Sequence, residues 1–467
     1  MIWHITKREL YDNLNNLRFA LATVLLIGLM ITNAIVYLRE HPTRVHQYRN
    51  SVAESLKVLT ARTDLYNIAL NGPGDIYKQP APLRFCAEGG ESFLSEFVDG
   101  GFWMWSYGEG FKDFWMLNYP ASNPNLLNIR PGVTKVDWVF IIGYVLSLLA
   151  LLFTFDSVSG ERERGTLRLM LANSIPRHTV LLGKFLGALI SLCIPTVLAI
   201  LINLLVISTS SAVHLSGEAW ERLGVIIVVA LAYTCLFLAL GLLVSTLTRR
   251  SSVSLVVLLL TWVIFVVFVP STLASIASGL SSPISFEELQ KRQNQRHREL
   301  WDAYRDRTSG DETLRRTQGR SEYILKQREQ QERSRREHLN QQITQVQQAR
   351  TVTRVSPTAI LQHSLEAFAG TGFARHLQFL ENVQRYAREY REFVENTDRA
   401  DPESLHLIGV PEGMSKKPVS PEAIPKFEDT LNLSKDFNAA TTDLLLLVLF
   451  VIVLLSAAYL AFVRVEV

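Results

Sequence analysis

The sequence predicts an all-α membrane protein with six transmembrane helices and two large extracytoplasmic insertions, the second made mostly of long helices. Two observations lead to this prediction. Hydrophobic residues make up 48% of the 467 residues and charged residues only 19%, and the apolar residues gather in long uninterrupted runs. Between the last two runs lies a stretch rich in charge and glutamine, which a bilayer would exclude.

Each apolar run is close to the length that a bilayer requires. A hydrocarbon core is about 30 Å thick, so a spanning helix needs about 20 apolar residues. The runs cover residues 19–38, 138–155, 185–207, 223–247, 253–270 and 444–463. The first run is too long for the apolar core of a signal peptide and no A-x-A-like site follows it, so we expect an uncleaved span.

Basic residues in the short loops set the expected orientation. The segment 156–184, the turn after residue 247 and the arm 1–18 are rich in Lys and Arg. Because short cytoplasmic loops carry an excess of these residues, we expect both termini in the cytoplasm. One flank opposes this orientation, namely Arg39, Arg44 and Arg49 after the first span, but the rule weakens for long loops.

Two insertions, 40–136 and 271–442, then lie outside the cytoplasm. The first is dense in aromatic residues interleaved with glycine, and four of them are candidate substrate contacts: Phe102, Trp103, Trp105 and Trp115. The favoured alternative is that these rings form the core of a small domain or lie at the level of the lipid headgroups.

The second insertion changes character along its length. Residues 283–354 are dominated by charged residues and glutamine with high helix propensity, and the break at 308–311 predicts two helices joined by a turn. Their apolar positions keep no strict heptad, so a partner surface would complete their burial. Ser356 and Pro357 then form a helix start, and an amphipathic helix follows from Phe373.

Catalytic motifs are absent from the sequence. It contains no Walker A pattern, no H-E-x-x-H and no G-x-S-x-G, so we expect no enzyme activity, no metal and no cofactor in this chain. Lys and Arg number 47 against 44 Asp and Glu, a balance that argues against nucleic-acid binding. The apolar runs hold no ionisable residue, which disfavours an ion-coupled carrier. Energy for transport would therefore enter from another subunit.

The loop 156–184 is where such a subunit could attach. Four alternating charges, Glu161 to Arg164, precede Gly165, which permits a bend, and Thr166, which can cap a new helix. Leu167, Met170 and Leu171 would form one apolar face of that helix, suited to a groove on a soluble partner. The residues alone equally allow an amphipathic helix lying on the membrane surface.

This loop resembles the signature of ABC-2-type transporter permeases. The resemblance rests on its spacing, in the order Phe155-Asp156, Glu161-Arg162-Glu163, Gly165-Thr166-Leu167, Pro176-Arg177 and Leu182-Gly183-Lys184. The arm 1–18 is similar as well, because it forms an amphipathic interface helix that includes Trp3, Lys7, Arg8 and Glu9. Two large insertions depart from the usual family pattern and resemble a subfamily with an enlarged domain before the last span.

The resemblance implies a permease that dimerises, with itself or a related permease, and binds two copies of a separate ATPase that holds ATP and Mg. Segment 161–171 would be the coupling region. Glu161 and Glu163 would meet basic residues of the ATPase, Arg162 and Arg164 acidic ones, and Leu167 and Leu171 would fill its groove. The energy of ATP hydrolysis would drive export or mechanical transmission. Whether a partner protein also binds outside the membrane is left open. The alternative is a membrane-anchored sensor or scaffold with a ligand-binding outer domain.

Overall fold

The computed structural model describes residues 2–89, 94–101, 115–119, 136–172, 176–210, 213, 215–273, 286–308 and 313–464. Within these residues, six helices are long and apolar enough to cross a membrane, and the chain is an all-α membrane protein apart from one small hairpin. The six spans are Leu17–Thr60, Trp138–Glu163, Arg177–Ser208, Gly217–Leu247, Ser251–Leu273 and Leu433–Val463.

The elements follow in chain order. The first part of the chain forms α1 (Ile2–Leu14), α2 (Leu17–Thr60), α3 (Leu65–Asn71), β1 (Gly74–Tyr77) and β2 (Phe97–Gly100). The second span is built from α4 (Trp138–Phe140), the π-helical η3 (Ile141–Leu146), α5 (Ser147–Thr154) and α6 (Ser159–Glu163). The middle continues with α7 (Thr166–Ala172), α8 (Arg177–Ser208), α9 (Gly217–Leu247), α10 (Ser251–Trp262) and the π-helical η4 (Val263–Phe268). The remainder forms α12 (Phe286–Thr308), α13 (Thr313–Thr353), α14 (Pro357–Ala369), α15 (Gly372–Arg399) and α16 (Leu433–Val463).

Polar residues fix where several helices begin. The side chains of Asn16, Asp64, Ser216 and Asn432 accept hydrogen bonds from backbone N–H groups in the first turns of α2, α3, α9 and α16. These N–H groups have no partner inside the helix, so a capping side chain stabilises the end by about 1 kcal/mol. These caps therefore fix the first residue of each of the four helices, which hydropathy alone does not determine.

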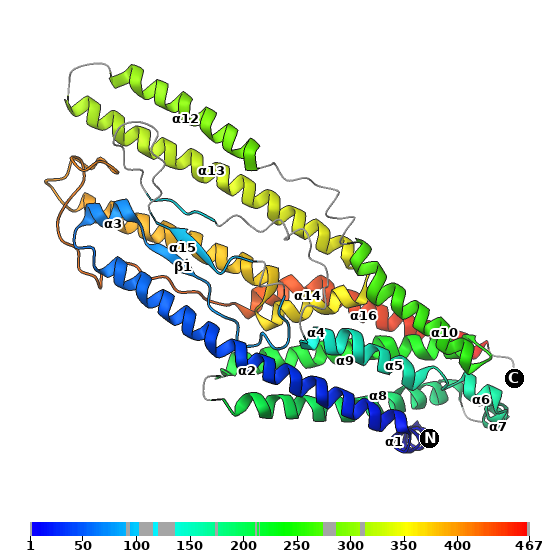
Figure 1. Cartoon of the computed structure of the whole chain (residues 1–467). Coiled ribbons are helices and arrows are strands. Elements are labelled where there is room, and N and C mark those ends of the chain that lie inside the picture. The colour runs from blue at the N-terminus through cyan, green and yellow to red at the C-terminus, as the bar shows by residue number, and fades with distance from the viewer. Residues whose placement is uncertain are drawn as a thin grey trace.

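The molecule is elongated and has two distinct ends (Figure 1). Both ends of the chain lie together with α6 and α7 at one end of the helical bundle, which we call the terminal end. At the opposite end, which we call the distal end, lie α3, β1 and much of α13 and α15 (Figure 1). The six spans connect the two ends.

Helix α2 is much longer than the apolar run that predicts it. It continues through Pro42 to Thr60 and contains 44 residues. At a rise of about 1.5 Å per residue it is about 66 Å long, more than twice the hydrocarbon thickness of about 30 Å. One unbroken helix thus runs from the terminal end into the distal region, where Leu59 is buried.

Both insertions contribute to a single distal domain. Its core combines Leu65 and Trp115 from the first insertion with Ile324, Tyr390 and Val410 from the second. Strands β1 and β2 pair antiparallel beside it, with Gly74 opposite Gly100 and Tyr77 opposite Phe97. The expected pair of helices around the break at 308–311 is confirmed as α12 and α13, and these helices contact each other.

Helix α14 lies within the range 271–442 expected for the second insertion, yet it packs against the spans. The range 271–442 would place it in the distal domain, but its apolar side chains, Ile360, Leu361, Leu365 and Phe368, belong to the core of the membrane bundle. The hydroxyl of Thr358 lies 3.1 Å from Oη of Tyr233 in α9. The Oγ of Ser356 donates to the carbonyl of Phe265 in η4, at 2.9 Å. Thirteen residues are too few to cross a bilayer, so a short apolar helix is buried among the spans instead.

Ion pairs at low exposure attach this region to the spans. Arg354, just before α14, donates from Nε to Oδ1 of Asp443 in α16 at 2.7 Å, and that carboxylate is only 2% exposed. Arg222 of α9 lies 2.7 Å from Asp436 of α16. Buried charges are tolerated only when they are paired, so these contacts specify how α16 is placed.

Candidate functional site

The segment between the second and third spans forms two short helices at the terminal end. Helix α6 ends at Glu163 and α7 begins at Thr166. Between them Gly165 adopts a φ of +72°, a conformation that L-residues with a side chain rarely adopt. The bend expected at Gly165 is therefore present. Thr166 is the first residue of α7, and its hydroxyl donates to the carbonyl of Glu161 at 3.2 Å.

Lys184 joins three separate segments at this end. Its Nζ lies 2.6 Å from Oε1 of Glu9 in α1 and 2.8 Å from Oε1 of Glu161 in α6, while Lys184 itself belongs to α8. The ammonium group is buried, with the side chain 2% exposed. An ammonium removed from water must be paired, and two carboxylates supply that pairing here. The cluster therefore holds α1, α6 and α8 together.

Glycines allow α1 to lie directly on α8. A Cβ at Gly183 would stand 2.8 Å from Cβ of Ile5, and one at Gly187 would stand 2.6 Å from Cβ of Glu9. Both distances are shorter than real contacts between carbon atoms, so no larger side chain fits without moving the helices. The hydroxyl of Thr6 also donates to the carbonyl of Gly183, at 3.3 Å.

The four predicted residues of the interface helix divide into two groups. Glu9 turns toward the bundle and reaches Lys184. Trp3, Lys7 and Arg8 are exposed, and Trp3 has 63% of its surface accessible. An exposed Trp and two basic residues on one short helix are typical of contact with a membrane surface.

The remaining charges of α6 contact this chain. Arg162 donates from Nη1 to the carbonyl of Thr248 at 3.0 Å. Glu163 accepts from the backbone N–H of Ser251 at 3.1 Å and from its hydroxyl at 2.7 Å, at the start of α10. Arg164 donates to the carbonyl of Gly160 within its own helix, at 3.1 Å. Arg162 and Glu163, expected to meet an ATPase, thus bind neighbouring elements of the permease, whereas Arg164 is exposed and bonds to its own helical turn.

Helix α7 presents a different apolar residue from the one expected. Leu167 is 2% exposed and packs in the bundle core, whereas Leu169 is 71% exposed. Met170 is partly buried against the same core, and the side chain of Leu171 lies outside the described residues. The spacing suggested an apolar face for docking, but the bundle covers part of that face because α7 folds back onto it.

Pro176 and Arg177 of the motif lie at the start of α8. Pro176 is the capping residue of that helix, with φ −60°, and Arg177 begins it. The guanidinium of Arg177 donates to the carbonyl of Phe462, at 3.2 Å, and to that of Val463 in the last turn of α16. A cation at a helix C-terminus satisfies carbonyls that have no partner inside the helix.

The sequence reasoning did not single out three residues that build this site. Asp156 lies 3.1 Å from Arg18 at the start of α2. The hydroxyl of Ser245 in α9 accepts from the backbone N–H groups of Val158 and Ser159, at 3.0 and 3.1 Å. Asp156 and Lys184 were noted only as part of the motif. A lysine directly before an apolar run was the available signal for Lys184, whereas a serine inside a span carries none.

The candidate substrate contacts are located only in part. Phe102, Trp103 and Trp105 lie outside the described residues. Trp115 is fully buried in the distal core, 5.3 Å from Tyr390 in an edge-to-face arrangement, with Arg391 over its ring at 5.0 Å. Its ring therefore packs as a core residue and offers no surface to a ligand in this conformation.

Comparison with known proteins identifies the family. A curated protein described as "Probable ABC transporter permease protein NosY", from Pseudomonas aeruginosa, is 32% identical over 137 residues. That match covers 28% of this chain and 48% of the relative, so it spans about half of the relative's length. A family model described as ABC-2 family transporter protein matches residues 3–467. A match over nearly the whole length means that this chain belongs to the ABC-2 family and is a membrane permease component of an ABC transporter.

Proposed function

We propose that this permease receives mechanical force from a separate ATPase through α7 and passes it through α6 to the spans. The observation that carries the proposal is the buried contact of Lys184 with Glu9 and Glu161, which joins the interface helix, α6 and the third span. Because this ammonium has little access to water, displacement of α6 alone would break a buried pair. Helix α6 therefore moves together with α1 and α8.

Further contacts extend this connection to other spans. Arg162 and Ser245 link the region of α6 to α9, and Glu163 links it to the first turn of α10. Asp156 links it to Arg18 at the base of α2. A displacement of α7 would thus reach three further spans, α2, α9 and α10, through direct hydrogen bonds and ion pairs, rather than through lipid.

The surface that meets the ATPase is assigned to the exposed side of α7. Leu169 is 71% exposed there and Arg168 lies beside it on the accessible side. An exposed leucine flanked by a cation suits a groove with an apolar floor and an acidic rim. Leu167 and the charges of α6 then anchor the segment to the permease instead of binding the ATPase.

The orientation follows from the same assignment. ATP is supplied in the cytoplasm, so the terminal end faces the cytoplasm of a bacterium and the distal domain lies outside its plasma membrane. Two ATPase copies would bind ATP and Mg beneath two permease chains, which are identical or closely related. This chain would bind no nucleotide itself.

The force received at α7 would drive either export across the membrane or mechanical transmission to the distal domain. Helix α2 supports the second possibility, because its base lies against Asp156 and its other end carries Leu59 into the distal core. A helix without a break transmits displacement along its axis. A sensor or scaffold without an ATPase remains the alternative that the experiment addresses.

The experiment uses Leu169→Asp in tagged full-length protein expressed in its native membrane. Mild solubilisation and affinity purification should recover a P-loop ATPase near equimolar amounts with the parent chain, and less than about a tenth of that amount with the variant. Leu314→Asp is the matched control, because Leu314 of α13 is 53% exposed and lies in the distal domain. Equal ATPase recovery with both variants would reject α7 as the docking surface. If no ATPase co-purifies with the parent chain, the result would favour the sensor or scaffold function.

A further inference from the structure

A polar pocket lies where α2 leaves its apolar stretch. The sequence places Arg39, Arg44 and Arg49 directly after residue 38, on the side of the membrane where the charge rule disfavours basic residues. The coupling function does not account for them. The first two line a pocket beside α2, and they directly follow the apolar run that ends at residue 38, where a spanning helix would leave the hydrocarbon core.

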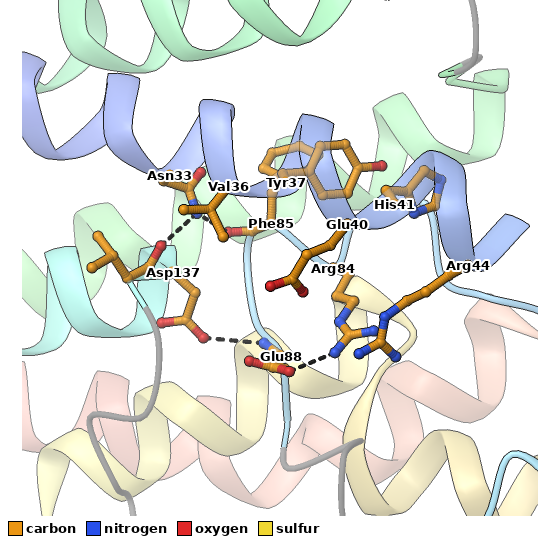
Figure 2. A pocket seen from close by; sticks show the side chains of 11 residues that line it. Asn33, Val36, Tyr37, Glu40, His41, Arg44, Arg84, Phe85, Glu88 and Asp137 are labelled. Atoms are coloured by element: carbon orange, nitrogen blue, oxygen red, sulfur yellow. Dashed lines mark hydrogen bonds and ion pairs between the residues drawn. The ribbon is translucent and has the colours of Figure 1, made fainter.

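The inner part of this pocket is a cavity of about 40 Å³ between α2, the loop around Phe85 and the start of α4. In Figure 2 the carboxylates of Glu40, Glu88 and Asp137 and the guanidinium groups of Arg44 and Arg84 extend into it. A cavity of this kind needs roughly 10–15 Å³ to hold one water molecule. The space therefore suits a group about the size of three or four waters.

Backbone contacts hold this cavity open in one shape. Asn33 of α2 donates from Nδ2 to the carbonyls of Phe85, at 3.0 Å, and Val136, at 2.8 Å (Figure 2). Asp137 accepts from the N–H of Phe140 at 2.9 Å and from the N–H of Glu88 at 3.0 Å. These bonds tie three chain segments together, so the lining does not depend on flexible side chains alone.

One lining residue indicates an absent partner. His41 is only 6% exposed and stacks on Tyr37, with 4.7 Å between ring centroids. Its Nδ1 is buried and has no hydrogen-bond partner among the described residues. A buried polar atom without a partner costs free energy, and native structures satisfy nearly all such atoms. A neutral imidazole nitrogen at this place can accept a hydrogen bond from a bound cationic donor.

An outer groove continues from the cavity. It measures about 470 Å³, is lined by Arg39, Thr43, Gln47 and Glu96, and shares Glu40 and Arg44 with the inner part. Arg44 pairs with Glu96 at 3.0 Å, but that carboxylate is 63% exposed and the pair is weak. One helical turn before Arg39 on the same helix, Ile35 is 42% exposed.

We propose that this two-part pocket binds the phosphoethanolamine headgroup of a phospholipid in the distal leaflet. The phosphate would contact Arg39 and Arg44 in the groove. Because Glu88 already pairs with Arg84 in the cavity, the primary ammonium would enter beside Glu40 and Asp137, with Nδ1 of His41 as a further acceptor. Guanidinium groups bind phosphate strongly, and carboxylates together with the Tyr37 ring favour a cation. A primary ammonium can donate N–H hydrogen bonds in the cavity, whereas a trimethylammonium group has no N–H donor.

The position of the pocket favours a lipid over a soluble molecule. Arg39 lines the groove, and the exposed Ile35 lies one helical turn before it on the same side of α2, so acyl chains would lie against Ile35 while the headgroup occupies the groove. A soluble phosphoethanolamine would gain only the polar contacts. The lipid gains burial of apolar surface in addition.

The test measures lipid binding to the full-length permease by native mass spectrometry, with palmitoyl-oleoyl phosphatidylethanolamine, phosphatidylcholine and phosphatidylglycerol as probes. We expect about tenfold tighter binding of phosphatidylethanolamine than of either other lipid. The double variant Arg39→Gln with Arg44→Gln should remove most of its binding. Glu40→Gln should reduce the preference for the ethanolamine headgroup over choline. Arg49→Gln and Glu54→Gln are matched controls, because both residues are exposed on α2 outside the pocket.

Three outcomes would overturn the proposal. The three lipids could bind equally, the double arginine variant could lose no more binding than Arg49→Gln, or soluble O-phosphoethanolamine could bind while the lipid does not. Unchanged melting temperatures of the variants establish that they fold. The measurement needs no ATPase, so its failure is distinct from failure of the coupling proposal.

Discussion

Replacement of Lys184 by Met should release α1 from the bundle. The substitution leaves the carboxylates of Glu9 and Glu161 facing each other without the shared ammonium. Breaking a fully buried pair costs about 3–5 kcal/mol, but these two side chains keep 22% and 21% of their surface exposed, so water lowers the cost. We therefore expect a free-energy cost of about 2–3 kcal/mol, which raises the population of detached α1 about 30- to 150-fold.

Limited proteolysis measures that population. Trypsin cleaves after Lys7 and Arg8 only when α1 is unfolded, so the rate of cleavage follows the fraction detached. Adding Glu9→Gln and Glu161→Gln to the Lys184 variant should restore most of the protection, because no unpaired charge then remains buried. Lys57→Met, an exposed change in the last turn of α2, is the control. A rate for the Lys184 variant within twofold of the parent would refute the role of the cluster.

Three further predictions concern packing, pH and the placement of α14. Gly187→Leu should lower thermal stability in nanodiscs by several degrees through the clash with α1, whereas Gly224→Leu, with open space at its Cβ, should not; equal losses would reject the close packing of α1 on α8. Burial raises the pKa of Asp137 to about 6 from 3.8, so its contribution to stability is present below about pH 4 and is lost as the pH rises through 6. Asp137→Asn should therefore flatten the change in melting temperature between pH 4 and 7.5, and an unchanged slope would contradict this. Arg354→Met should destabilise the protein by about 3 kcal/mol because it leaves the buried carboxylate of Asp443 without this partner. Adding Asp443→Leu should recover most of the lost stability, measured by thermal unfolding. No recovery would mean that the pair does not act as a unit.

The sequence predicted what depends on local composition. The six spans follow from the length of apolar runs, and the helices α12 and α13 follow from helix propensity around the break at 308–311. The Gly165 bend follows from the requirement for a positive φ. Each of these features depends on residues close together in the chain, so periodicity and composition are sufficient.

The contacts of the candidate site depend on residues far apart. Lys184 meets Glu9, 175 positions away, and Arg354 meets Asp443, 89 positions away. Hydropathy ends the first span at residue 38, yet α2 continues to Thr60 because distal packing stabilises residues that are polar in sequence. The sequence of α14 predicts part of an outer domain because the helix is too short to cross a bilayer. Its position among the spans depends on tertiary packing. Tertiary packing also buries Leu167, which was expected to face a partner, and leaves Leu169 exposed.

The most direct test of the coupling proposal is photo-crosslinking from position 169 in native membranes. A photoreactive amino acid in place of Leu169 should capture a P-loop ATPase, identified by mass spectrometry, and the same residue at position 314 should not. Capture of the ATPase at position 169 alone would establish α7 as the surface that receives the stroke. Crosslinks only to lipid at position 169, in membranes where the ATPase is present, would contradict the account.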